Sequence, residues 1–122
     1  MFKTLDVPED NLTVIRVEAG SCGFVSRIKA KKENKRTVRI QIESDCESLD
    51  DLGFILEENG PFGIVDFMST NPAKNRVFQL AWDKLPHAAC PAAMAIIKAC
   101  EVELGLNVPC PVSIQFEECA ED

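Results

Sequence analysis

The chain has 122 residues, of which 46% are hydrophobic and 27% charged, proportions typical of an ordinary soluble globular protein. This length favours one domain built around one core, residues 1–122. Its 13 Lys and Arg residues against 20 Asp and Glu residues give a formal net charge of −7, which argues against non-specific nucleic-acid binding.

The first third of the sequence predicts three strands. β-branched residues favour a strand over residues 12–17, and a second strand is expected over residues 22–31, with Phe24 on its buried face. A turn is expected at residues 32–35. The basic run at residues 29–36 is interpreted as a solvated turn, with docking of an acidic partner as the alternative. The third strand is the clearest, because apolar and polar residues alternate strictly. Its apolar face is predicted to consist of Val38, Ile40 and Ile42. One buried face and one wet face suggest an antiparallel meander.

After Cys46 the apolar period changes from two residues to the spacing of a helix. Ser44 or Asp45 can cap this helix, and the Asn-Gly-Pro sequence at residues 59–61 ends it. A short second helix is predicted over residues 62–68. A third helix is predicted from residues at helical spacing: the apolar Val77, Leu80 and Ala81, followed by the basic Lys84.

The fourth helix has the best-defined start. Cys90 is expected at the N-cap and Pro91 at the first helical position, where its missing N–H costs nothing. Gly105 is predicted to end this helix. A last strand is predicted over residues 112–116, where Val, Ile and Phe alternate with polar residues, and the prolines before it indicate an edge strand. The apolar stripe of the helix is predicted to consist of Ala93, Ile96, Ile97, Cys100 and Leu104.

The predicted order of elements is β-β-β-α-α-α-α-β. It defines an α+β domain with a mostly antiparallel sheet, made of a three-stranded N-terminal meander plus a C-terminal strand. The helices are expected to pack on one face of that sheet.

The location follows from what the chain lacks. The N-terminal residues contain no apolar run typical of a secretory signal, and no segment approaches the roughly 18 apolar residues of a membrane span. We therefore predict a cytoplasmic protein with no membrane partner, in a compartment where structural disulfides are rare. The six cysteines are then better explained by metal or redox chemistry. Inert core thiols and disulfides are the alternatives.

Three cysteines occupy positions that suit a bound or reactive thiolate: Cys22, Cys46 and Cys90. Cys22 lies between glycines that free the backbone to turn. Cys46 follows a strand directly and begins a helix. Cys90 begins a helix, where unsatisfied N–H groups and the helix dipole stabilise a thiolate. If the fold brings the three together, they suit zinc or an iron–sulfur cluster.

Two neighbouring side chains could complete such a site. His87, the only histidine, could ligate the metal or assist deprotonation of Cys90. Asp45 is a possible oxygen ligand beside Cys46. The carboxylates that flank Cys46 oppose its ionisation unless a metal is bound, which favours ligation over nucleophilic attack. Cys100 lies on the apolar stripe of the fourth helix and is predicted to be a core residue.

Other activities have less support. There is no CxxC pair, no GxGxxG, no P-loop and no GxSxG, so the sequence does not favour a zinc ribbon, a nucleotide-binding protein or a hydrolase. Whether the protein is an enzyme is left open, with a non-enzymatic role favoured. The first hypothesis is therefore metal or cluster binding. The alternatives are a thiol or sulfur-transfer protein with Cys90 as nucleophile, and a small acidic interaction domain with structural cysteines.

The spacing of these cysteines resembles a known family. A Cys-Gly pair, two strands, a second cysteine, and a later His and Cys that open a helix are similar to the iron–sulfur scaffold proteins of the IscU and NifU N-terminal type. The intervals are 24 residues from Cys22 to Cys46 and 44 from Cys46 to Cys90. The family has an Asp where this chain has Phe24, and its histidine directly precedes the third cysteine. The resemblance implies an IscU-like α+β domain whose three cysteines hold a nascent cluster or zinc, with a sulfur donor or acceptor protein as partner.

The sequence also looks like small prokaryotic proteins of a domain family of unknown function that carry SCGF, DCE and HAACP segments. This second resemblance implies no activity.

Overall fold

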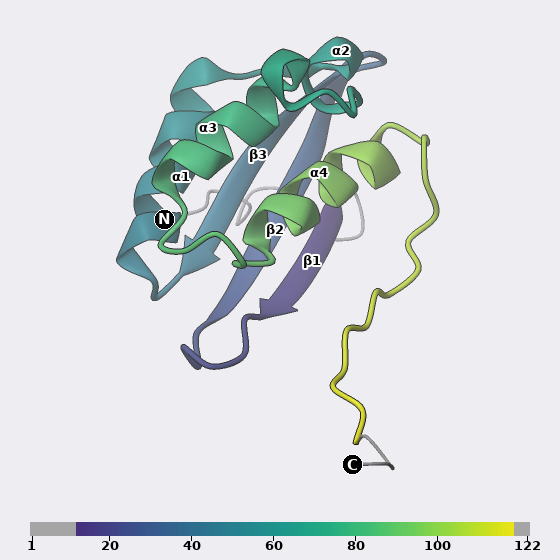
Figure 1. Cartoon of the computed structure of the whole chain (residues 1–122). Helices are drawn as coiled ribbons and strands as arrows, with labels where there is room; N and C mark the ends of the chain where they lie inside the picture. The colour runs from purple at the N-terminus through teal and green to yellow at the C-terminus, as the bar shows by residue number, and fades with distance from the viewer. Residues whose placement is uncertain (1–11, 119–122) are drawn as a thin grey trace.

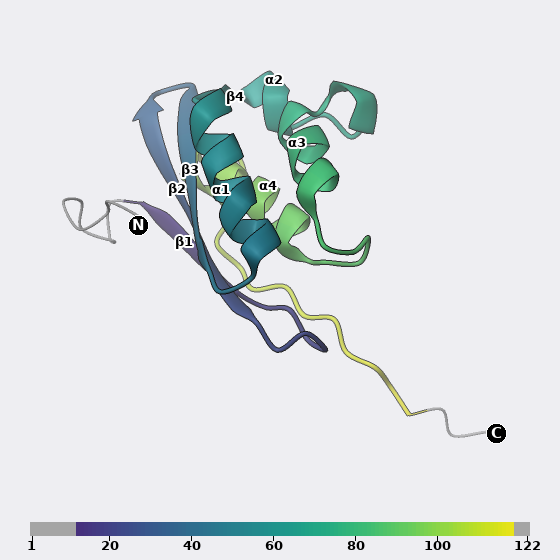
Figure 2. The same cartoon turned by 90° about the vertical axis from the view of Figure 1, so that its left-hand side faces the viewer.

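The computed structural model describes residues 12–118. Its strands form one antiparallel sheet whose spatial order follows the chain: β1 (Thr13–Glu18), β2 (Val25–Asn34), β3 (Thr37–Ser44) and β4 (Phe62–Gly63). The helices are α1 (Glu47–Asn59), α2 (Ile64–Phe67), the short 3-10 helix η3 (Pro72–Lys74), α3 (Arg76–Lys84) and α4 (Ala92–Glu103). The helices cover one face of the sheet (Figures 1 and 2). The predicted α+β class, with helices on one face of a mostly antiparallel sheet, is therefore confirmed.

The core lies between the apolar face of the sheet and two helices. α1 packs along β3, and α4 packs over β2 and β1. The alternation predicted for β3 is confirmed, since Val38, Ile40 and Ile42 are all buried. The largest side chains with almost no exposed surface are Phe62, Phe67, Ile28, Ile40, Leu52, Leu56 and Ile96. Burying such side chains stabilises the fold by about 1.5–3 kcal/mol each.

Gly53 lets α1 lie close to β3 at Ile42, in the part of the strand that does not pair with β4. A Cβ atom at this glycine would lie 3.4 Å from the Cβ of Ile42 and 3.6 Å from its carbonyl oxygen. The missing side chain therefore brings the helix axis close to the strand backbone. α1 thus flanks β3 beyond Val38, the last residue that β4 pairs with.

The opposite face of the sheet carries charged residues. Glu43 on β3 accepts a hydrogen bond from Lys29 Nζ at 3.0 Å, and its other oxygen lies 3.6 Å from Arg27 Nη1. Lys29 is nonetheless only 2% exposed. A buried ammonium needs a charged or hydrogen-bonding partner, and Glu43 is one.

Several element boundaries differ from the sequence prediction. β2 begins at Val25 rather than at residue 22, so Phe24 lies outside the strand and is exposed. The following turn lies at residues 35–36 rather than at residues 32–35, because the Asn34 side chain accepts hydrogen bonds from the amides of Arg36 and Thr37. Residues 62–68 are not one helix: two of them pair with β3 as β4 before α2 begins.

The fourth strand of the sheet is β4, and the strand predicted over residues 112–116 does not form. That segment is extended and exposed, and within residues 12–118 no strand pairs with it. Its alternation of apolar and polar residues suits a strand, but a strand also requires a partner edge. The chain leaves α4 and runs away from the domain (Figures 1 and 2).

Candidate functional site

The three candidate cysteines lie in segments at the same end of the sheet. Cys22 is in the turn from β1 to β2, and Cys46 is in the connection from β3 to α1. The register places both at the same end, because Glu18 pairs with Val25 and Ser26 with Ser44. This end is at the bottom of the sheet in Figure 1.

The start of α4 lies at this same end, which brings in Cys90. At the other end of the helix, Glu103 accepts hydrogen bonds from Thr13 Oγ1 and from the amide of Lys32, both at 2.8 Å. Thr13 and Lys32 lie at the opposite end of the sheet from the two cysteine-bearing connections. Because α4 packs along β1 and β2, its first residues must lie near the cysteine end.

Cys22 is held in a turn that depends on two glycines. Gly20 and Gly23 have φ angles of 96° and 78°, a region that favours glycine, and the amide of Gly23 donates to the carbonyl of Gly20 at 2.9 Å. The prediction that glycines turn the chain at this cysteine is confirmed. The Cys22 side chain is exposed to solvent.

Cys46 occupies the N-cap position of α1 and is only 8% exposed. The sequence suggested Ser44 or Asp45 as the cap of this helix, but neither residue is the N-cap, and no side chain caps the helix. Instead the Cys46 amide donates to Ser44 Oγ at 3.0 Å, and Ser44 Oγ also accepts from the buried Ser26 hydroxyl at 2.8 Å. A chain of two hydrogen bonds thus fixes the backbone of Cys46 to the end of the sheet. Asp45 is exposed.

Cys90 lies one residue before the N-cap of α4, which is Pro91 and not Cys90 as predicted. The shift has a backbone cause: Pro91 accepts the first helical hydrogen bond, from the amide of Ala95 at 3.1 Å. Cys90 donates its own amide to the carbonyl of His87 at 3.2 Å, so the two residues share one tight turn. Cys90 is 7% exposed, whereas His87 is exposed.

These residues are gathered at one end of the fold, but they are not assembled as a set of ligands. Within residues 12–118 no group of three or more His, Cys, Asp and Glu side chains lies close enough to hold a metal ion. Cys46 and Cys90 both belong to the apolar core cluster, whereas Cys22 lies outside it on an exposed turn.

The remaining cysteines differ from these three. Cys100 is fully buried, as predicted for a core residue, and burial together with the charges of Glu101 and Glu103 raises the pKa of its thiol from 9.0 to about 12. Cys110 is exposed on the extended C-terminal segment. Cys119 lies outside the described residues.

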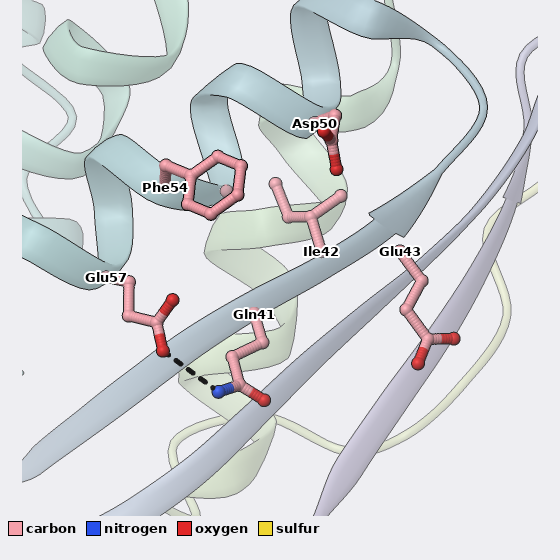
Figure 3. A pocket seen from close by; sticks show the side chains of 7 residues that line it. Gln41, Ile42, Glu43, Asp50, Phe54 and Glu57 are labelled. Carbon is pink, nitrogen blue, oxygen red and sulfur yellow. Dashed lines mark hydrogen bonds between the residues drawn. The ribbon is translucent and has the colours of Figure 1, made fainter. Parts of the chain in front are cut away.

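A hollow that the sequence did not indicate lies between β3 and α1 (Figure 3). Its volume is about 110 Å3, below the roughly 300–1,000 Å3 of small-molecule sites. Gln41 spans part of it by donating from Nε2 to Glu57 Oε2 at 3.2 Å. Its lining residues are Gln41, Ile42, Glu43, Asp50, Gly53, Phe54 and Glu57. The hollow is too small to enclose an organic substrate.

The fold and this end of the sheet define a small α+β domain with three cysteine-bearing connections at one end. The chain belongs to a family of unknown function, DUF6951, whose model matches residues 13–116. This confirms the expected likeness to a family of unknown function. No curated protein and no solved structure matches the chain. In the described part of the chain, no helix is long and apolar enough to cross a membrane.

Proposed function

We propose that this protein binds a metal ion or an iron–sulfur cluster through the thiolates of Cys22, Cys46 and Cys90. It would serve as a scaffold, a carrier or a sulfur acceptor, with a sulfur donor or acceptor protein as its partner. The observation that carries the proposal is that the three cysteine-bearing connections lie at the same end of the sheet. Cysteines separated by 24 and 44 residues share this end of the fold although nothing in the local sequence requires it.

The chemistry of the donor set fits such a group. Three thiolates are the usual majority ligands of structural zinc and of iron–sulfur clusters. The same connections contain two candidates for a fourth ligand, since His87 shares a turn with Cys90 and Asp45 precedes Cys46. Both are exposed and free to reorient.

The segment that would have to move in this scheme is the turn that carries Cys22. Cys46 and Cys90 are held by their backbones at the ends of packed helices, whereas Cys22 lies on an exposed turn. Ligation therefore requires the turn between β1 and β2 to close toward the start of α4. Gly20 and Gly23 give its backbone the conformational range for this movement.

The resemblance to the iron–sulfur scaffold proteins adds support of a second kind. In those proteins three cysteines at the tip of an α+β domain hold the cluster. Here the three cysteines follow the same order along the chain, in connections at one end of an α+β domain. The bound group would be an iron–sulfur cluster or zinc.

The test is the metal content and visible absorption of protein purified without oxygen. Iron with sulfide-to-iron charge-transfer bands would establish a cluster, and zinc alone would establish a zinc site. Replacing Cys22, Cys46 and Cys90 one at a time with Ala should lower the metal content in each case. Cys110→Ala is the matched control, because Cys110 is an exposed thiol away from these connections.

Two outcomes would overturn the proposal. One is the absence of both metals from the anaerobically purified protein and after incubation with iron and sulfide or with zinc. The other is a metal content that is unchanged in all three variants. If metal is absent and Cys90 alone is alkylated rapidly at neutral pH, the alternative of a thiol-transfer protein is favoured instead.

A further inference from the structure

The C-terminal segment of the described chain is extended, apolar and exposed. Three of its large apolar side chains alternate with polar ones, and their exposed fractions are 55% for Val112, 81% for Ile114 and 106% for Phe116. Ile114 and Phe116 are therefore almost fully open to solvent, and Val112 is more than half exposed. Exposing three large apolar side chains on one face of an extended segment is unfavourable in water, so this segment is suited to bind a partner surface.

The pattern of the segment defines the kind of surface that would receive it. Strict alternation over residues 112–116 gives an extended chain one apolar and one polar face, as in a strand with one side on a core. Pro109 and Pro111 disfavour a helix just before it. Such a segment is typical of a strand that adds to the open edge of an existing sheet.

The fold offers one long open edge. Within residues 12–118, β1 (Thr13–Glu18) pairs only with β2, so its outer edge has no partner strand along all six residues. The other edge is less available, since β4 covers part of β3 and α1 flanks the rest. Ile15 is only partly buried at the β1 edge and packs against the core cluster. A strand placed beside β1 would extend the apolar face that lies under α4.

We propose that residues 112–116 of one chain add as a strand to the β1 edge of a second copy, so that two chains exchange their C-terminal segments. The lengths agree, because β1 has six residues and the donated segment five. Residues 106–111 would span up to about 20 Å when extended, a distance comparable to the thickness of such a domain. Each chain carries both the edge and the segment, so two chains can each donate to the other, and such a reciprocal exchange closes as a symmetric dimer.

This inference is independent of the proposed metal site. The donated segment leaves α4 at the end opposite to the cysteine-bearing connections, and it contains none of the three candidate ligands. A monomeric protein would therefore not contradict the proposed metal site, and a protein without metal would not contradict the proposed dimer.

The experiment is sedimentation equilibrium of the full chain over a wide concentration range, with a reductant to prevent disulfides through Cys110. The test variant is Ile114→Asp with Phe116→Asp, which places two charges on the apolar face. The matched control is Ser113→Asp with Gln115→Asp, which places the same charges on the polar face. We expect a dimer whose dissociation constant rises at least about 100-fold in the test variant and stays within about tenfold in the control.

Hydrogen exchange identifies the edge that is used. In the dimer, the amides of residues 112–116 and the β1 amides that point away from β2 should be protected. Both sets should lose protection in the test variant, and these β1 amides should also lose it in a chain that ends at residue 111. The unfolding midpoint of the dissociated domain should not change, because the segment makes almost no contact with the core.

Three results would overturn the proposal. The first is a full chain that is monomeric at all concentrations. The second is a dimer that survives removal of residues 112–116. The third is a monomer in which residues 112–116 are protected, which would mean that the segment folds back onto its own sheet.

Discussion

Ser44 joins the sheet to the candidate site, and its replacement by Ala gives the sharpest test of how the backbone of Cys46 is held. Its hydroxyl oxygen accepts one hydrogen bond from the Ser26 hydroxyl at 2.8 Å and another from the Cys46 amide at 3.0 Å. Ser44→Ala removes both acceptor interactions at once. Ser26 is 2% exposed, so water cannot readily replace the lost partner.

The expected cost follows from these contacts. A buried hydroxyl left without its acceptor costs about 1–3 kcal/mol, and the Cys46 amide adds about 0.5–1 kcal/mol. We therefore expect Ser44→Ala to lower the free energy of unfolding by about 1.5–4 kcal/mol. Ser26→Ala removes only the donor and should cost about 1 kcal/mol. The double variant should cost about 1 kcal/mol less than the sum of the two single variants, because no unpaired hydroxyl is left behind.

Urea unfolding of the parent, the two single variants and the double variant measures this coupling. Ser69→Ala is the control, since the Ser69 hydroxyl makes only exposed hydrogen bonds, accepting from the Asn71 amide and donating to the Asn71 carbonyl, and its loss should cost less than about 0.5 kcal/mol. A coupling energy within about 0.3 kcal/mol of zero would refute the proposed hydrogen-bond chain. In Ser44→Ala we also expect Cys46 to react faster with a thiol reagent, because its backbone anchor is lost.

Two further predictions concern the core. Asn75→Ala should lower the free energy of unfolding by about 2–4 kcal/mol, measured in urea, because this buried amide donates to the carbonyls of residues 67 and 69 and accepts from the amide of residue 78. Asn71→Ala, at an exposed cap whose side-chain oxygen accepts one hydrogen bond from the Ala73 amide, should cost about 1 kcal/mol or less, and equal losses in the two variants would contradict this account. The raised pKa of Cys100 means that the unfolded chain ionises this thiol first, so its contribution to stability is intact below pH 9.0 and is lost as the pH rises toward about 12. Relative to Cys100→Val, the parent should lose up to about 1.4 kcal/mol per pH unit in this range, and parallel pH profiles would disprove it.

The parts of the fold that could be predicted are those in which local pattern and tertiary packing agree. The alternation of Val38, Ile40 and Ile42 predicts a strand, and the sheet uses that face against α1. Gly105 ends α4 with a φ of 78°, as its position indicated. In both cases the residues that set the local conformation also meet the partner that the pattern implies.

The sequence predictions fail where the local conformation depends on a partner strand. Residues 112–116 alternate as clearly as β3 does, but no strand edge within residues 12–118 pairs with them, and local sequence does not contain that information. β4 has only Phe62 and Gly63, too few residues for any periodicity, and forms because Val38 and Thr37 lie opposite.

The candidate site shows the same division. Sequence placed Cys22, Cys46 and Cys90 at segment ends, where each is found or nearly so. That the three segments share one end of the sheet follows from the antiparallel register and from the packing of α4, which are both long-range properties. The exact cap of α4 was missed by one residue because Pro91, not Cys90, accepts the first helical hydrogen bond.

The order in which the core is covered has a consequence for biosynthesis. The strands pair in the order in which they are made, but α4 lies over β1 and β2, the first two strands of the sheet. During synthesis Ile28 and Ala30 therefore lack their cover until residues 92–103 have left the ribosome, more than sixty residues later. The nascent sheet carries an exposed apolar face for that interval, which makes it prone to aggregation, and the core is complete only when α4 has been made.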